Sequence, residues 1–236
     1  MVRSLGHALL HDVSLFERLY TGPDLPGMAK TMLNVQYRFP EALARFPSDE
    51  FYQGNLLSSI SGAEATNVLQ PLLSSHFPWP RVDGQVQPAV FVHCGTEEDH
   101  GGMSKSNEGQ AALVKHIVKL LSTSSVEGAS GEPLAGADLP SITVLTPYTK
   151  QTKLLHSMLR APVQAFTIDS FQGRESDIIG FVEDARRMNV AWTRARRALV
   201  VVGDKRTMTG AVGLWQRAVG SCVEVAIQMP EEQTQK

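Results

Sequence analysis

Short apolar runs alternate with amphipathic segments beyond residue 140, and this alternation constrains the fold more than any other feature of the chain. Short apolar runs predict strands, whereas apolar residues spaced three and four apart predict helices. The expected strands are 142–146, 163–168, 177–179, 198–202 and 222–227, and the expected helices are 148–159, 184–195 and 209–218. Strands separated by helices pair in parallel, so the pattern predicts an α/β fold with a mainly parallel sheet and helices on both faces.

The first part of the chain gives weaker signals. Ser14 and Glu17 have the spacing of a capping box, which predicts a helix over 14–20. Residues 32–37 are expected to form a strand that Pro40 ends, and residues 89–94 form a second apolar strand. A helix is expected after Asn107, because one helical face would carry Val114, Ile117, Val118 and Leu121.

Composition suggests how the chain is divided. Residues 41–88 contain scattered aromatic residues and prolines, which indicates an irregular segment packed over a core edge. Residues 122–140 are rich in Gly, Ser, Ala and Pro and are expected to be a flexible insertion. We therefore expect one domain over 14–228, preceded by a lead over 1–13 and followed by a disordered tail over 229–236.

The 236 residues carry a net charge of -2, so any binding of nucleic acid needs a local basic patch. The two cysteines, Cys94 and Cys222, are far apart and are expected to be buried, reduced thiols rather than a disulfide or a metal pair. No apolar run approaches the ~18 residues of a membrane span, and no charged-then-apolar leader opens the chain. These features predict an intracellular protein, cytoplasmic or nuclear, with no membrane partner.

Residues 167–197 contain most of the polar chemistry. The first part is a polar turn with a glycine, formed by Asp169, Ser170, Gln172, Gly173, Arg174 and Glu175. The second part is dense in arginine, with Arg186, Arg187, Arg194, Arg196 and Arg197. Both parts are unusual in a mildly acidic chain, which makes this stretch the first candidate for a functional site.

Loops at the carboxyl ends of parallel strands form a ligand crevice. We expect three loops there: Tyr37–Arg38 after the first strand, residues 169–175, and the arginine helix that begins near Asp184. The plainer interpretation is a surface arginine at Arg38 and a solvated face on the helix. The helix also contains residues typical of partial burial, however, and buried arginines need partners. Fixed arginines suit phosphate, because the guanidinium fork matches its geometry.

Seven segments of the chain together resemble a known family. They are SLFERL, LNVQYRFP, FPSDEFYQGNL, VLTPYTKQ, TIDSFQGRESDII, RRMNVAWTRARRALVVVGD and GLW. Their order resembles that in the second RecA-like motor domain of superfamily 1 helicases, in the branch typified by the nonsense-mediated-decay RNA helicase. The resemblance runs from Ser14 to Trp215 and implies a RecA-like fold.

The resemblance also implies a role for each matching residue. The catalytic pair would be Arg38, which contacts the γ-phosphate of ATP, and Arg194, the arginine finger. The residues at the nucleotide edge would be Gln36, Tyr37, Gly173 and Glu175. The residues that contact single-stranded RNA or DNA, or couple to it, would be Thr146, Pro147, Asp169, Ser170 and Gln172, with Tyr148 nearby.

The chain departs from the family in its phosphate chemistry. It contains no G-x-x-x-x-G-K-[ST] phosphate loop, and no strand ending in paired acids precedes Ser14 to hold magnesium. In the family both belong to the first motor domain. We therefore expect ATP and Mg to be used only together with a first motor domain, in cis or in trans. We expect no metal ligands in this chain and negligible ATPase activity from the chain alone; a robust magnesium-dependent ATPase signal would contradict this.

A second departure follows Ile179. Family members carry a longer strand and loop there, whereas here Gly180 and Phe181 follow directly. The shortening is expected to remove most of a central strand and to cost several kcal/mol, by analogy with large core deletions.

Three classes of function remain open. The first is the motor half of an ATP-dependent RNA or DNA helicase. The second is a truncated, non-catalytic paralogue that binds nucleic acid or a protein partner. The third is an incomplete product with no independent role. The choice between RNA and DNA stays open as well, because contacts to the sugar decide it.

Overall fold

The computed structural model describes residues 15–23, 25–99, 104–123, 140–181, 188–210 and 213–230, and it divides into two compact units, 1–34 and 35–236. The first unit contains helix α2 (Leu15–Thr21), which confirms the helix expected over 14–20. The capping residue Ser14 lies outside the described residues. The second unit contains all the other elements, so the fold and the candidate site belong to it.

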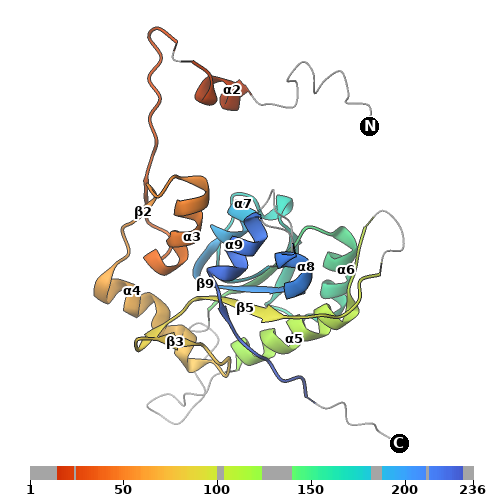
Figure 1. The fold of residues 1–236 in the computed structure, drawn as a ribbon. Coiled ribbons are helices and arrows are strands. Elements are labelled where there is room, and N and C mark those ends of the chain that lie inside the picture. Colours follow the sequence, from red (N-terminus) through yellow and green to blue (C-terminus); the bar gives the residue numbers. More distant parts are fainter. Residues whose placement is uncertain are drawn as a thin grey trace, which may run out of the picture. The chain divides into compact units, whose positions relative to one another are not determined.

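The second unit is built on a six-stranded sheet in which every neighbouring pair is parallel (Figure 1). The order of strands is β10 (Val223–Glu224), β5 (Ala89–His93), β9 (Ala195–Gly203), β8 (Ser176–Phe181), β6 (Ile142–Thr146) and β7 (Gln164–Thr167). This topology confirms the predicted α/β fold with a mainly parallel sheet.

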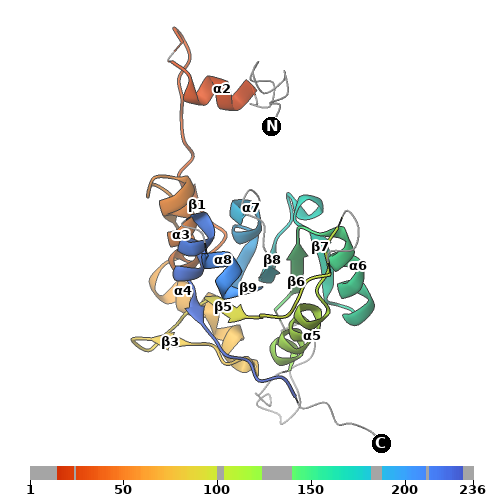
Figure 2. The same ribbon diagram turned by 45° about the vertical axis from the view of Figure 1, so that its right-hand side comes forward.

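Helices cover both faces of this sheet, as predicted (Figures 1 and 2). The helices α5 (Glu108–Ser122) and α6 (Thr149–Met158) lie on one face. The opposite face carries α3 (Glu41–Phe51), α7 (Met188–Trp192) and α9 (Leu214–Gly220), with the short α8 (Lys205–Thr209) beside them. Strand β9 shows why two faces are needed: Val200 and Val202 belong to one core cluster, whereas Leu199 and Val201 belong to the other.

The segment 32–37 is not the first strand of the main sheet. Only β1 (Val35–Gln36) is extended, and it pairs in parallel with β2 (Leu57–Ser58) in a separate two-stranded sheet. The apolar residues of this segment thus predict a longer strand than the one that forms. The prediction of a strand end just before Arg38 is nevertheless confirmed.

The segment 41–88 packs on the core, as predicted, but the prediction that it is irregular is wrong. The segment forms α3, α4 (Gly62–Leu69), the 3-10 helix η1 (Gln70–Ser74) and a hairpin of β3 (Arg81–Val82) and β4 (Gln85–Val86). Pro47 stands inside α3 and cannot donate the helical hydrogen bond to the Leu43 carbonyl. The indole Nε1 of Trp192 donates to that carbonyl instead, at 3.0 Å. The helix therefore tolerates its proline because of a residue far along the sequence.

The expected loss of a central strand is also wrong. Strand β8 is six residues long and lies between β6 and β9, with residues 178–181 in register with 142–145 of β6. The core side chains Ile178 and Ile179 are 1% and 0% exposed. The chain therefore keeps this central strand, and the residues that follow it, 182–187, lie outside the described residues.

Other predicted boundaries also shift. The helix expected over 209–218 is two helices, α8 and α9, and the strand expected over 222–227 is only β10. Most of the expected insertion, 124–139, and the end of the expected tail, 231–236, lie outside the described residues. Cys94 and Cys222 are free thiols, Cys94 buried and Cys222 partly buried. None of the helices in the described ranges has the length and apolar character to cross a membrane.

Candidate functional site

Arg38 is held by a tight turn that Gln36 closes. The Oε1 atom of Gln36 accepts hydrogen bonds from the backbone N–H groups of Arg38 (2.8 Å) and Phe39 (3.0 Å), and its Nε2 donates to the Phe39 carbonyl (2.6 Å). Phe39 is buried at 3% exposure, which anchors the turn to the core. Tyr37, between them, is 77% exposed. The Gln36 amide thus bonds within the turn, whereas Tyr37 is open to solvent.

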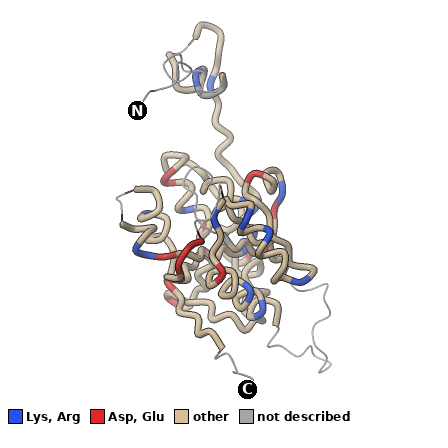
Figure 3. The backbone as a smooth tube through the Cα atoms, turned by 90° about the vertical axis from the view of Figure 1, so that its right-hand side faces the viewer, with Lys and Arg blue, Asp and Glu red and all other residues tan. Residues whose placement is uncertain are grey.

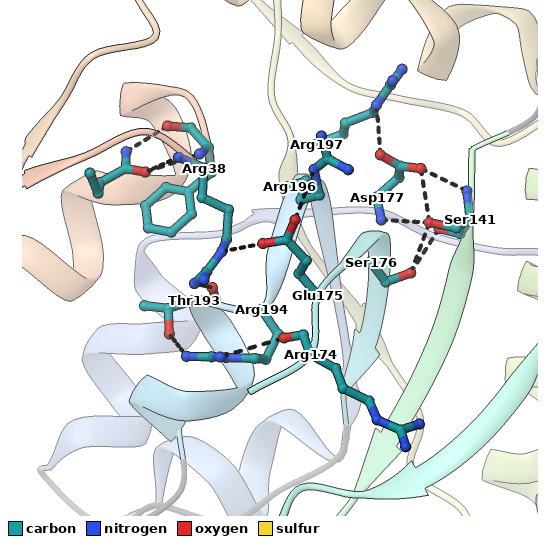
Figure 4. Close-up of polar contacts among 12 residues, drawn as sticks. Arg38, Ser141, Arg174, Glu175, Ser176, Asp177, Thr193, Arg194, Arg196 and Arg197 are labelled. Atoms are coloured by element: carbon teal, nitrogen blue, oxygen red, sulfur yellow. Dashed lines mark hydrogen bonds and ion pairs between the residues drawn. The ribbon is translucent and has the colours of Figure 1, made fainter. Parts of the chain in front are cut away.

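The guanidinium of Arg38 reaches two segments far along the sequence (Figure 4). Its Nε donates to Oε2 of Glu175 at 2.7 Å, and its Nη1 donates to the carbonyl of Thr193 at 2.8 Å. The side chain of Arg38 is 33% exposed and that of Glu175 is 44% exposed. The sequence motifs that contain Arg38, Glu175 and Thr193 therefore meet in one place.

Arg194 lies beside this contact but not on a helix, contrary to the expectation of an arginine helix over 184–195. Helix α7 ends at Trp192, and β9 begins at Ala195. The Nε of Arg194 donates to the Val190 carbonyl at 3.1 Å, which curls the side chain back over the helix end. The remaining candidates Arg186 and Arg187 lie outside the described residues.

The charge of Arg194 is disfavoured where it lies. Burial lowers the pKa of its guanidinium from the ordinary value, and the positive charge of Arg38 lowers that pKa further. The Glu175 carboxylate and Tyr52 act in the opposite direction on the same pKa. A second anion near this pair of arginines would relieve their repulsion.

The polar turn expected as one loop spans the sheet instead. Strand β7 ends at Thr167, level with Thr146 at the end of β6, whereas β8 begins at Ser176, beside Ser141 before the start of β6. Residues 168–175 therefore run from the carboxyl edge of the sheet, the ends of β6 and β7, back to its amino edge, the starts of β6, β8 and β9. This crossing begins in the 3-10 helix η2 (Asp169–Phe171), and Phe171 is buried at 4% exposure.

Glycine is required where this segment turns. Gly173 has a φ of +84°, in the left-handed region that side chains with a Cβ rarely adopt. Beyond it, Glu175 lies at the amino edge, with its Oε1 at 3.6 Å from Nε of Arg196. The prediction of a single crevice at the carboxyl ends of the strands is therefore wrong for Arg38, Glu175 and Arg194, which gather at the amino edge.

The candidates for nucleic-acid contact lie at the carboxyl edge. The buried Thr146 ends β6, and its Oγ1 accepts from the backbone N–H of Tyr148 at 3.3 Å. Pro147 lies between them and is partly buried. After the neighbouring strand β7, Oγ of Ser170 in η2 donates to the Thr167 carbonyl at 2.9 Å. Asp169, Ser170 and Gln172, which follow β7, are all exposed.

A buried amide network, which sequence reasoning missed, holds the loop after β5 at the same carboxyl edge. Gln151, 1% exposed, accepts from the backbone N–H of Asn107 at 2.8 Å and donates to its carbonyl at 3.2 Å. The Asn107 side chain caps α5 by accepting from the Gln110 N–H, and it donates to the Thr96 carbonyl at 2.8 Å. The one available signal was a polar Gln151 at the end of the VLTPYTKQ segment.

A second missed cluster ties three strands at the amino edge. Asp177 at the start of β8 accepts from the backbone N–H and hydroxyl of Ser141 at 2.9 and 2.8 Å, and from Nε of Arg197 at 2.9 Å. Burial raises the pKa of Asp177, but the Ser141 hydrogen bonds and the charge of Arg197 lower it more, so the net shift is downward. Spacing gave no signal for this cluster, because its members come from three separate segments.

The donors at the amino edge suit a polyphosphate. The four guanidinium groups of Arg38, Arg194, Arg196 and Arg197 outnumber the two carboxylates of Glu175 and Asp177, and guanidinium pairs with phosphate oxygens. Both signs of charge are spread along the chain (Figure 3), so this excess is local. Within the described ranges, no cluster of three or more His, Cys, Asp or Glu side chains could hold a metal ion.

Comparisons with known proteins show which family the chain resembles. Residues 11–206 match the family model described as an AAA domain. The chain is 33% identical to Regulator of nonsense transcripts 1 from Dictyostelium discoideum, over 83% of the chain and 15% of the relative. It is also 33% identical to the DNA polymerase alpha-associated DNA helicase A of Saccharomyces cerevisiae, over 82% of the chain and 30% of the relative.

A solved structure, the C-terminal domain of a possible DNA helicase from Lactobacillus plantarum, covers 80% of the chain at 13% identity with a TM-score of 0.41. The chain spans less than a third of the length of the two relatives above. The family match covers most of the chain, and the order of motifs agrees with it. The chain therefore belongs to the AAA domain family, as a motor domain of superfamily 1 helicases of the nonsense-mediated-decay RNA helicase type.

Proposed function

We propose that this chain is the second motor domain of an ATP-dependent helicase and acts on ATP bound by a first motor domain. The observation that carries the proposal is the meeting of Arg38, Glu175 and Thr193–Arg194 at the amino edge of the sheet. In the proposal Arg194 is the arginine finger and Arg38 contacts the terminal phosphate. The proposed site of action is intracellular, cytoplasmic or nuclear.

The two arginines would act by position and charge. Phosphoryl transfer needs positive charge aimed at the transferring group, and a guanidinium remains charged at neutral pH. Backbone carbonyls orient both side chains, that of Thr193 for Arg38 and that of Val190 for Arg194. ATP and Mg, when bound by a first motor domain, would supply the reacting phosphate and its counter-charge. We assign to the edge of the nucleotide the group Gln36, Tyr37, Gly173 and Glu175.

The carboxyl edge is the proposed path of single-stranded RNA or DNA. Exposed hydroxyl and amide groups there can bond to the phosphate and sugar backbone without reading sequence. The residues proposed for this role are Thr146, Pro147, Asp169, Ser170 and Gln172. Residues 168–175 run from this edge to the amino edge. A displacement of bound RNA or DNA at the carboxyl edge would therefore be transmitted to Glu175 through one short segment.

Reconstitution tests the proposal. The chain is mixed with a separately produced first motor domain, with magnesium, ATP and a single-stranded oligonucleotide, and phosphate release is measured. We expect ATPase activity from the mixture, and a fall of about 10³-fold or more in Arg194→Ala, the range for removing an arginine finger. Arg217→Ala is the matched control. Arg217 lies on α9 and pairs with Glu50 on α3, so this substitution also removes an arginine that pairs with a glutamate. Equal activity of Arg194→Ala and the control would contradict the proposal.

A second candidate is a non-catalytic module that binds nucleic acid or a protein partner. The observation that favours it is the absence of a phosphate-loop motif from this sequence. Salt-sensitive binding of a single strand, without ATPase activity in the mixture, would support this candidate. The lack of both activities would leave the chain without an independent role.

A further inference from the structure

The carboxylate of Glu175 faces more than one arginine at the amino edge. Its Oε2 accepts from Nε of Arg38 at 2.7 Å, and its Oε1 lies 3.6 Å from Nε of Arg196. It also counteracts the positive charge that Arg38 imposes on Arg194. Glu175 is therefore the internal counterion of this group of arginines.

We propose that Glu175 is a built-in competitor of phosphate: its carboxylate occupies Arg38 until a terminal phosphate displaces it. The proposal rests on the proposed contact between Arg38 and ATP. It adds that the site takes up a polyphosphate by exchanging one anion for another. The Arg38 guanidinium is then not left unpaired in the absence of nucleotide.

The geometry of Arg38 supports an exchange of this kind. The Nε edge of a guanidinium recognises carboxylate and phosphate oxygens alike, so the Glu175 oxygen holds a place that a phosphate oxygen can take. The second contact of Arg38, from Nη1 to the Thr193 carbonyl at 2.8 Å, involves no charge on the acceptor. That contact can persist during the exchange and keep the guanidinium in place.

The exposure of the pair makes the exchange easy. The side chains of Arg38 and Glu175 are 33% and 44% exposed, and ion pairs of such exposure alter an equilibrium by no more than about fivefold. The pair between Arg197 and Asp177 differs, since its side chains are 29% and 15% exposed and Asp177 is also bonded to Ser141. Glu175 is thus the carboxylate at this edge that can leave its arginine.

The balance of charge also favours a polyanion over the carboxylate. Four guanidinium groups (Arg38, Arg194, Arg196 and Arg197) stand against two carboxylates (Glu175 and Asp177), which leaves an excess of two positive charges among these residues of the amino edge. A terminal phosphate carries more negative charge than a carboxylate and offers three acceptor oxygens. It can therefore satisfy several of these arginines together.

A calorimetric titration of the chain with inorganic tripolyphosphate tests the proposal. We expect Glu175→Gln to bind tripolyphosphate roughly two- to fivefold more tightly than the unsubstituted chain, because the competitor is removed. Arg38→Gln should bind it more weakly. Glu50→Gln is the matched control: it removes the same charge and an ion pair with Arg217, whose Nη2 lies 2.8 Å from Glu50 Oε2, and its affinity should be unchanged.

The outcomes separate this proposal from the proposed function. Equal or weaker binding by Glu175→Gln, with weaker binding by Arg38→Gln, overturns the competitor and leaves the phosphate contact of Arg38 standing. Unchanged binding by Arg38→Gln overturns that contact itself. If binding is measurable only in Glu175→Gln and not in the unsubstituted chain, the result supports Glu175 as a competitor of phosphate. A lack of binding in both the unsubstituted chain and Glu175→Gln overturns the proposal. An equal gain in Glu50→Gln would show a general effect of charge and would also overturn it.

Discussion

At the scale of single residues, the fold depends on side-chain hydrogen bonds to backbone groups that their own helix leaves unpaired. Pro47 removes one helical donor from α3, and the Leu43 carbonyl would be unpaired in the core without Trp192. An unpaired buried acceptor costs about 1–3 kcal/mol. Trp192 is 2% exposed and also packs on Phe46, with ring centroids 4.4 Å apart. Its contribution therefore has a polar and an apolar part.

A double-mutant cycle separates the two parts. Trp192→Phe should lower the free energy of unfolding by about 2–4 kcal/mol, from the lost donor and the lost volume. In a Pro47→Ala background the same change should cost about 1 kcal/mol less, because the substituted alanine would donate its own N–H to the Leu43 carbonyl. Urea unfolding of the four proteins measures both values. Equal costs in the two backgrounds would show that the indole bond contributes nothing to stability.

Sequence patterns located the polar residues of the site but not their partners. Arg38, Glu175 and Arg194 stand in segments that the sequence marked, and the structure brings them together. Two of the contacts that orient these arginines are backbone carbonyls, which carry no signature in a sequence. Ser141 and Asp177 were missed for a related reason, since their pairing depends on the order of strands in the sheet.

At the scale of elements, the strand starts at the amino edge are joined by one carboxylate. Asp177 on β8 bonds to Ser141 beside β6 and to Arg197 on β9, so it fixes the stagger of three strands. Its pKa is lowered from an ordinary value of 3.8, because the hydrogen bonds and the arginine outweigh its burial. A carboxylate with a lowered folded-state pKa stabilises the fold above its unfolded pKa, and this contribution is lost as the pH falls through the folded value.

Asp177→Asn should therefore change how the free energy of unfolding depends on pH in the acid range. We expect this substitution to lower stability by about 1–3 kcal/mol at pH 7, since it removes charge-assisted hydrogen bonds to a partly buried carboxylate. Below about pH 4, the ordinary value of a free aspartate, the gap between the two proteins should shrink, because the unfolded parent chain takes up a proton at Asp177 that the folded protein takes up only at lower pH. Urea midpoints from pH 7 down to pH 2 measure the gap. A gap that stays constant across this range would contradict the linkage.

The elements themselves were predicted unevenly, and composition explains the difference. The strand 142–146 was predicted with its observed bounds because both of its faces are buried and its residues are apolar or β-branched. Helix α3 was missed because proline and aromatic residues obscured its period, and its stability depends on Trp192. The opposite placement of Asp169 and Glu175 was missed because residues 168–175 are shorter than the usual parallel crossover.

At the scale of the whole molecule, the sheet is continuous through its centre. Strand β8 pairs with β6 on one side and β9 on the other, and Ile178 and Ile179 contribute to the two separate core clusters. The chain therefore has a complete central strand with both isoleucines buried in the core. Closing a longer flexible connection between two ordered segments costs only about 0.6 kcal/mol for each doubling of its length.

Lengthening the connection after Phe181 tests this account of the whole fold. Six Gly and Ser residues inserted after Phe181 roughly double the connection 182–187 and should lower the free energy of unfolding by about 0.6 kcal/mol. Ile179→Ala serves as the control for sensitivity, because Ile179 is 0% exposed and its truncation should cost about 2–5 kcal/mol. Urea unfolding compares the three proteins. A gain of several kcal/mol from the insertion would mean that the short connection strains the sheet and that β8 forms at a cost, which its pairing on both sides argues against.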